Sequence, residues 1–477
     1  ALELLEYDLS VSFSAAEGRA LELAAEAIQE EAAALTAAAL SAGPAATASQ
    51  LTIISNATTE PVDASGVTGL ASDNISNIKT LLTAGNDTAQ FTEDSFSLLA
   101  TVDVSDGTLS GSDLADAIDQ ANAATGNTTT GFTITAAVEI TGTEEDFTAL
   151  IADEDAQQIE ITDENLTIDS GTTISVATAR LLSGTTAGTV TGTITSGTTV
   201  AAMLDENTGL IETDAYTITI AEEDEKVLAK DLTDLYSKTS VAVDANAVTQ
   251  ITGTVAEANI VYGAGDSEIT GLGNEIVVTT DNSLTLESAE SAGSSTLAGL
   301  NTLDNNTVGM VNAASIQSIT GLLADLLTAY GSNGITGLDN EDIILSDKTV
   351  SVSDLNTLNS FTSGSINAES VENISGSIEA LNNACISQGI INLGTNITVT
   401  DVVSTATDIN LLDNLSAGII DANSIETLTG SSASVNTIYD SAVTTEDDDG
   451  ISNLGDEVVI LSDSSIDSST LSSIATA

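Results

Sequence analysis

The sequence predicts a repeat solenoid of the β-rich α/β kind, in which each unit reads strand, short helix, strand, short helix. Three observations lead to this prediction. Sequence blocks recur along the chain, short β-branched runs alternate with Leu and Ile at helical spacing, and only 2 prolines interrupt 477 residues. One strand and one short helix cannot bury both apolar faces alone, so neighbouring units must share a core.

Two kinds of block carry the repetition. The first aligns without a gap in VDANAVTQITGTVAEANIVY (243–262), VNAASIQSITGLLADLLTAY (311–330), INAESVENISGSIEALNNAC (366–385) and IDANSIETLTGSSASVNTIY (420–439). The second lies between them, in EITGLGNEIVVTTD (268–281), GITGLDNEDIILSD (334–347), GIINLGTNITVTD (389–401) and GISNLGDEVVILSD (450–463). Insertions therefore fall between the blocks, as expected when each block is one structural unit.

The first 50 residues differ from the repeats. YDLSVSFS (7–14) alternates like a strand, and SAAE (14–17) is a capping-box pattern that opens a long Ala- and Glu-rich helix ending at Gly43 and Pro44. Residues 1–50 are interpreted either as a cap on their own array or as an arm that docks on a neighbouring subunit. Three residues of the apolar stripe on this helix are candidate assembly residues: Leu21, Ile28 and Leu35.

Degenerate repeats are expected over 51–240 and regular ones over 241–477. Runs such as Ile343–Leu345 predict strands, and the leucine spacing in 351–361 and 404–415 predicts short helices. One corner of the repeat is expected to need a left-handed backbone, because small or amide residues recur there: Gly271, Gly337, Asn392 and Asn453. An acid follows each strand of the second block and is expected to make a turn or cap a helix: Asp281, Asp347, Asp401 and Asp463.

The charge excludes several partners. With 72 acidic and 7 basic residues the formal charge is −65, which repels nucleic acid and anionic lipid head groups. We therefore expect no nucleic-acid partner and a surface hydrated by water and cations. No apolar run reaches the about 18 to 20 residues of a transmembrane segment. A chain that opens on Ala1 is consistent with removal of a signal peptide, so an extracellular or cell-surface location is expected.

The residue inventory favours a protein that is not an enzyme. Without histidine, the Ser-His-Asp and Cys-His arrangements and His-containing zinc sites are excluded. Cys385 fills a slot that holds tyrosine in sister repeats, which favours a buried apolar thiol over a nucleophile. Calcium is the possible cofactor: Glu446, Asp447, Asp448 and Asp449 form either a weak calcium site or a solvated charge run, and 153–155 is a weaker second site.

The blocks VDANAVTQITGTVAEANIVY, GITGL and VVILSDSSIDSSTLSSI resemble the repeats of very large secreted cell-surface proteins of marine cyanobacteria and other marine bacteria. The resemblance is good over about 240–477, weaker over 60–240 and absent before residue 50. It implies an extracellular structural or adhesive role. The short length and the distinct N-terminal helix depart from a giant adhesin and favour a small subunit built from the same units.

The two ends of the array have complementary phase. The chain begins its repeats with a second-half block (62–82) and finishes with a first-half block (458–475), so a second copy is expected to continue the stack head to tail. The predicted function is a self-assembling subunit of an extracellular filament or surface layer. A monomeric or anchored adhesin and a viral fibre or appendage component are the alternatives. Three residues of the last block are candidate assembly residues: Val459, Leu461 and Leu471.

Overall fold

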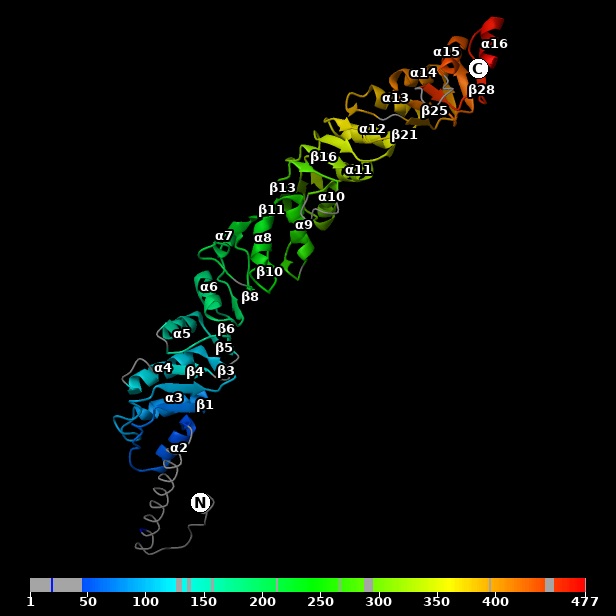
Figure 1. Ribbon diagram of the computed structural model, residues 1–477. Helices are drawn as coiled ribbons and strands as arrows, with labels where there is room; N and C mark the ends of the chain where they lie inside the picture. The colour runs from blue at the N-terminus through cyan, green and yellow to red at the C-terminus, as the bar shows by residue number, and fades with distance from the viewer. Residues whose placement is uncertain are drawn as a thin grey trace, which may run out of the picture. The chain divides into compact units, whose positions relative to one another are not determined.

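The computed structural model describes residue 19 and residues 45–476, apart from 126–130, 135–138, 156–157, 212, 266, 287–294, 394–395 and 442–449. In these ranges parallel strands alternate with helices, so the predicted α/β repeat class agrees with the structure (Figure 1). The chain divides into two units. The first runs to Thr219 and includes Ser237–Val241, and the second comprises Ile220–Tyr236 and the chain from Ala242 onward.

Apart from residue 19, the predicted N-terminal strand and long helix lie outside the described residues, and so do Leu21, Ile28 and Leu35. Among the helices that the structure does describe, none combines the length and the apolar character needed to cross a bilayer.

The first unit contains six described helices and eight described strands. Its helices are α2 (Ala48–Ala57), α3 (Ile75–Gly85), α4 (Gly111–Thr125), α5 (Glu144–Asp155), α6 (Val176–Thr185) and α7 (Val200–Met203). Its strands are β1 (Gly69–Asp73), β2 (Thr101–Val104), β3 (Thr108–Ser110), β4 (Gly131–Ile134), β5 (Glu139–Gly142), β6 (Asn165–Ile168), β7 (Val190–Thr193) and β8 (Ala215–Thr217). They form two parallel sheets, in the orders β1-β2-β4 and β3-β5-β6-β7-β8.

The second unit holds the more regular repeats. Its helices are η2 (Glu222–Asp224, a 3₁₀ turn), α8 (Ala229–Tyr236), α9 (Val255–Ala264), α10 (Leu297–Asn306), α11 (Leu323–Gly331), α12 (Val352–Phe361), α13 (Ile378–Ile386), α14 (Ala406–Leu415), α15 (Ser432–Asp440) and α16 (Ser468–Thr476). Its first strands are β9 (Lys226–Leu228), β10 (Val243–Asp244), β11 (Gln250–Gly253), β12 (Ile269–Thr270), β13 (Ile276–Thr279), β14 (Ser283–Leu284), β15 (Val311–Asn312), β16 (Ser318–Gly321), β17 (Ile335–Thr336) and β18 (Asp342–Leu345). The remaining strands are β19 (Thr349–Ser351), β20 (Ile366–Asn367), β21 (Asn373–Gly376), β22 (Ile390–Ile391), β23 (Asn396–Val399), β24 (Val403–Thr405), β25 (Ile419–Asp421), β26 (Thr427–Gly430), β27 (Gly450–Ser452) and β28 (Val458–Leu461).

Equivalent strands of successive blocks pair in parallel in the second unit. The sheet orders are β10-β12, β17-β15-β13-β11-β9, β14-β16-β18-β20-β22, β19-β21-β23-β25-β27 and β24-β26-β28. Each helix from α8 to α16 contacts the next helix in sequence. The structure therefore confirms the helices predicted over 351–361 and 404–415 and the strand predicted at Ile343–Leu345.

The left-handed corner is confirmed at all four positions. The φ angle is 84° at both Gly271 and Gly337, 56° at Asn392 and 62° at Asn453. Asparagine adopts this conformation more readily than most residues. The Asn453 side chain also contacts the neighbouring repeat, since Nδ2 donates to Asp421 Oδ1 of β25 at 2.7 Å. The corner also explains why each block of the second kind contains two strands instead of the predicted one. It divides each extended segment into two short strands that join different sheets, as with β17 and β18.

Among the described residues of the second unit, one apolar core extends through the repeats from Val255 to Ile451. Register-matched isoleucines on consecutive strands line it, and Ile319, Ile343 and Ile366 are fully buried. From the helix side, the first, fourth and seventh residues point inward, such as Val352, Leu355 and Leu358 of α12. Every interior block thus buries its apolar residues against the blocks before and after it.

The acids that follow the strands cap helices of the preceding block. Asp347 Oδ2 accepts a hydrogen bond from the backbone N–H of Leu323, the first residue of α11, at 2.8 Å. Asp281 and Asp401 do the same for α9 and α13, each at 2.7 Å. The predicted capping role is confirmed, with the carboxylate coming from the next block in sequence. Negative charge at this end also complements the helix dipole.

Replacement of Asp347 by Ala should destabilise the second unit by about 1 kcal/mol, the usual cost of losing a helix cap. The loss should be clear at this helix because its N-cap residue, Leu322, provides no side-chain hydrogen bond. The midpoint of urea unfolding measures the effect. Glu369→Ala removes an exposed acid of the same unit and serves as the control; equal midpoints for the two variants would contradict the capping role.

Candidate functional site

Two of the predicted assembly residues lie on β28, at the edge of its sheet. Val459 and Leu461 occupy the positions that Ile343 and Leu345 hold on β18, where both side chains are fully buried. On β28 both are only partly buried, although they still pack against the core. The inward face of this strand is therefore only partly covered.

The third predicted residue shows a larger difference. Leu471 is the fourth residue of α16, and the fourth residues of α12, α14 and α15 are all 0% exposed, whereas Leu471 is 49% exposed. These core positions are buried in interior blocks. In the last block they form a partly exposed apolar surface. We call Val459, Leu461 and Leu471 together the terminal face.

The predicted calcium residues cannot be placed. Glu446, Asp447, Asp448 and Asp449 lie outside the described residues. Within the part of the chain that the structure describes, no three acids, cysteines or histidines gather closely enough to hold a metal ion.

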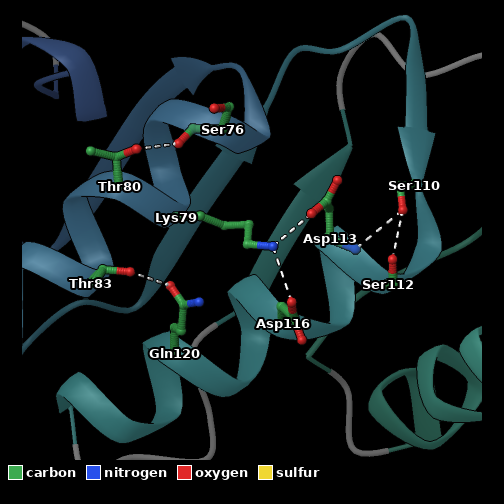
Figure 2. Close-up of polar contacts among 9 residues, drawn as sticks. All are labelled: Ser76, Lys79, Thr80, Thr83, Ser110, Ser112, Asp113, Asp116 and Gln120. Carbon is green, nitrogen blue, oxygen red and sulfur yellow. Dashed lines mark hydrogen bonds and ion pairs between the residues drawn. The ribbon is translucent and has the colours of Figure 1, made fainter.

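A groove of about 630 Å³ lies in the first unit, lined by residues of α2, α3 and the first turn of α4. Figure 2 shows Lys79 of α3 reaching across to α4, where Nζ donates to Asp113 Oδ1 at 2.6 Å and Asp116 Oδ2 at 3.1 Å. The hydrogen bond to Asp113 is the main cause that raises the pKa of Lys79. A nucleophilic lysine needs a lowered pKa, so this side chain joins two helices as a cation.

Two threonine hydroxyls of this groove are also engaged within the protein. Thr80 Oγ1 donates to the carbonyl oxygen of Ser76 at 2.8 Å, and Thr83 Oγ1 donates to Gln120 Oε1 at 3.2 Å (Figure 2). A ligand would have to compete with these internal contacts. The polar groups named above therefore serve contacts within the protein and are not held ready for a ligand.

Lys79 belongs to a pattern that the sequence analysis missed. It is the fifth residue of its helix, and the fifth residues of several helices in the second unit are asparagines that donate to the next helix. Asn301 Nδ2 bonds the carbonyl oxygen of Asp325 at 3.0 Å, and Asn410 Nδ2 that of Ser434 at 2.9 Å. The signal was visible as asparagine one residue after the fourth, apolar position, as in VSDLN and ATDIN.

Tyrosine and glutamate form a second contact that repeats. Tyr330 Oη donates to Glu341 Oε2 at 2.7 Å, and Tyr262 Oη donates to Glu275 Oε2 at 3.0 Å. Glu341 is fully buried and also accepts the backbone N–H of Asp339. Burial and the adjacent carboxylate raise the pKa of Tyr330. The pair fixes the corner between a helix and the following strand.

The block with Cys385 lacks both partners of this pair. Cys385 stands in the tyrosine slot, and Thr395, which lies outside the described residues, stands in the slot of Glu341. Cys385 is half-buried against the core, and burial raises the pKa of its thiol. A raised pKa lowers the thiolate fraction and so the reactivity. The joint replacement of tyrosine and glutamate is the signal that identifies them as a pair.

The weaker acidic site predicted at 153–155 lies at the end of α5. Asp153 is partly buried, and burial, followed by the negative charge of Asp119, raises the pKa of Asp153 to about 6. Such a carboxyl binds a proton more readily than an ordinary surface aspartate.

Comparison of the sequence with protein-family models and with curated proteins finds no match.

Removal of the Tyr330 hydroxyl should destabilise the second unit by about 1 to 3 kcal/mol, because the buried Glu341 carboxylate loses a donor. Tyr330→Phe keeps the ring stacked near Phe361, at a centroid distance of 6.3 Å, so it isolates the hydrogen bond. Urea unfolding of Tyr330→Phe, Glu341→Gln and the double variant forms a mutant cycle. Strictly additive effects would show that the two side chains are not coupled.

Asp153 should make the first unit less stable as the pH rises from about 4 to about 6. Its pKa is raised from 3.8 to about 6 on folding, so the folded chain binds more protons in this window than the unfolded chain. Asp153→Asn should therefore lose less stability between pH 4.5 and pH 7 than the parent chain. Thermal unfolding midpoints at both pH values measure this, and identical changes in the two proteins would rule out the effect.

Proposed function

We propose that this chain is an extracellular structural protein, a self-assembling subunit that joins head to tail into a filament or surface layer. The observation that carries the proposal is the terminal face, where Leu471 is 49% exposed at a position that is buried in interior blocks. An apolar surface of this kind on a soluble protein marks an interaction site.

The proposal includes a solenoid architecture. Successive helices of the second unit contact one another, and equivalent strands pair in parallel. In a solenoid each repeat supplies the core of its neighbours, and terminal repeats need a polar cap to remain soluble as monomers. β28 and α16, the last strand and helix that the structure describes, present apolar side chains that are only partly buried.

A further repeat from a second copy fits this surface best. It would add a parallel strand to the free edge of β28 and a helix against Leu471, reproducing contacts that interior repeats make. Such a contact joins two different surfaces, so it propagates without closing. Residues 1–50, with Leu21, Ile28 and Leu35, are proposed to reach across the junction.

The charge and the inventory of reactive groups support a structural role outside the cell. A net charge of −65 favours hydration by water and cations over contact with nucleic acid. Lys79 and Cys385 both have raised pKa values, which suits neither for nucleophilic chemistry. Attachment to a cell surface is part of the proposal, since the resemblance to secreted surface repeats points the same way. Binding of calcium by Glu446, Asp447, Asp448 and Asp449 is also part of it, because clustered carboxylates suit a hard cation.

Replacement of Leu471 by Asp should abolish assembly, because it places a charge in the apolar contact. Leu411→Asp is the matched control: Leu411 is 46% exposed, also on a helix of the second unit, but outside the core positions. Sedimentation velocity and negative-stain imaging in seawater-level salt and calcium measure assembly, and circular dichroism confirms folding.

The expected result is polymers for the parent chain and Leu411→Asp, and monomers for Leu471→Asp. Concentration-independent monomers for all three proteins would overturn the proposal. Monomers that bind glycans or cells would then indicate an adhesin, and compact trimers a fibre component.

A further inference from the structure

Asparagine followed directly by glycine occurs once in the 477 residues, at Asn333 and Gly334 in the turn between α11 and β17. In such a pair the backbone nitrogen of the glycine can attack the side-chain amide carbon of the asparagine, because no side chain on the glycine obstructs the approach. Asn333 is exposed, so water reaches its amide and ammonia can leave. This turn is therefore a place where the chain can react with itself.

The turn also supplies a path for the proton that must leave the attacking nitrogen. The Gly334 N–H donates to Ser332 Oγ at 2.9 Å, and Ser332 Oγ donates to Asp304 Oδ2 at 2.7 Å. A weak nucleophile is activated by a hydrogen-bonded base that a third group orients. Here the three groups are a backbone amide, a hydroxyl and a carboxylate. The proton on nitrogen can pass to the hydroxyl while the hydroxyl proton passes to the carboxylate.

Other turns of the second unit show which of these residues the fold requires. Four of them make the same hydrogen bond, from a glycine N–H to the Ser or Thr hydroxyl two residues earlier. They are 307–309, 362–364, 387–389 and 416–418. Their middle residues are Val308, Ser363, Gln388 and Ala417. The hydroxyl and the glycine recur, but the turn forms without asparagine in the middle.

The carboxylate distinguishes this turn from the one in the next repeat. A Cβ atom on Gly334 would lie 2.0 Å from Asp304 Oδ1, so any side chain here would displace the carboxylate that receives the Ser332 hydrogen bond. In the turn 387–389 the same place is taken by Asn359, whose Oδ1 would lie 2.2 Å from a Cβ atom on Gly389. Asp304 and Asn359 are the eighth residues of α10 and α12. Of these five turns, only the one at 332–334 combines asparagine, glycine and this carboxylate.

We propose that Asn333 is a site of self-modification, where the folded chain converts this asparagine to aspartate and isoaspartate. The Gly334 nitrogen forms a bond to Cγ of Asn333 and gives its proton to the Ser332 and Asp304 relay. The bond between Cγ and Nδ2 breaks, and the departing nitrogen takes up a proton and leaves as ammonia.

Water then opens the cyclic imide that this step leaves behind. Cleavage of the new bond between Cγ and the Gly334 nitrogen gives aspartate, and cleavage at the backbone carbonyl of residue 333 gives isoaspartate. Either product carries one carboxylate in place of the amide. The reaction needs no enzyme, cofactor or second copy, so it is independent of the proposed function.

The conversion alters the chain where β17 joins its sheet. Isoaspartate directs the main chain through its own side chain and so lengthens the main chain by one atom. This extra atom comes directly before Gly334, whose carbonyl oxygen accepts the backbone N–H of Val311 at 2.8 Å. Both products also add a negative charge next to Gly334, which already lies against Asp304. Because β17 is an edge strand, the change should loosen this strand and leave the other strands of the sheet paired.

The test incubates the folded, full-length chain in mildly alkaline buffer and follows the exchange of amide for carboxylate by peptide mapping with mass spectrometry. Asn423, which is exposed and precedes Ser424, is the internal reference. Asn333 should be converted about tenfold faster than Asn423 or more, with isoaspartate among the products. Equal conversion at the two residues would overturn the inference.

Two variants separate the reacting residue from its relay. Asn333→Gln takes the residue of the aligned position 388 and should abolish the conversion, because the longer side chain closes a less favoured ring. Asp304→Asn takes the residue of the aligned position 359 and keeps an acceptor oxygen for Ser332. It should slow the conversion of Asn333 about tenfold and leave Asn423 unchanged. Urea unfolding midpoints confirm that both variants fold.

The internal reference makes the second variant decisive. An unchanged rate at Asn333 in the Asp304→Asn chain would show that the carboxylate takes no proton. A rate that falls equally at Asn333 and Asn423 would show a general effect on the chain. Either result would overturn the relay.

Converted chains carry one more negative charge, so anion-exchange chromatography separates them from unconverted chains. In the isoaspartate fraction the backbone N–H of Val311 should exchange its hydrogen faster, because its acceptor on Gly334 is displaced. Equal protection of Val311 in both fractions would contradict the loosening of β17.

Discussion

The structure of the second unit depends on one constraint: a block of one helix and a few short strands can bury its apolar side chains only against its neighbours. Ile319, Ile343 and Ile366 show this directly, because each is fully buried between register-matched residues of adjacent blocks. Core and pairing therefore extend together, one block at a time. The residues of the terminal face lack part of the cover that this constraint gives to the same positions in interior blocks.

Much of this fold could be predicted because equivalent positions of several blocks can be compared within the one sequence. Asn392 and Asn453 align with Gly271 and Gly337, and only a left-handed corner accommodates both residue types readily. The capping aspartates were predicted from their position after the strands. The division of extended segments into strands of two sheets was not predicted, since it depends on pairing between blocks that sequence spacing does not reveal.

The candidate site was predicted only in part. Val459, Leu461 and Leu471 were named from the last block, and the structure places all three at core positions with incomplete cover. The sequence analysis missed the helix-to-helix contact of Asn410 and the pairing of Tyr330 with Glu341. The partners come close only in the folded chain, so the sequence alone does not show that they meet.

The capping aspartates also determine when the first turns of some helices can be completed during synthesis. The carboxylate that completes α11 lies 24 residues after the amide it binds, and that of α13 lies 23 residues after. α9, α11 and α13 thus each depend on the following block for one hydrogen bond of their first turn. α16 instead uses Asp467, its own flanking residue, whose hydrogen bonds to Ser469 and Thr470 lower its pKa to about 2. In α9, α11 and α13, by contrast, this hydrogen bond can form during synthesis only after the following block has been added to the chain.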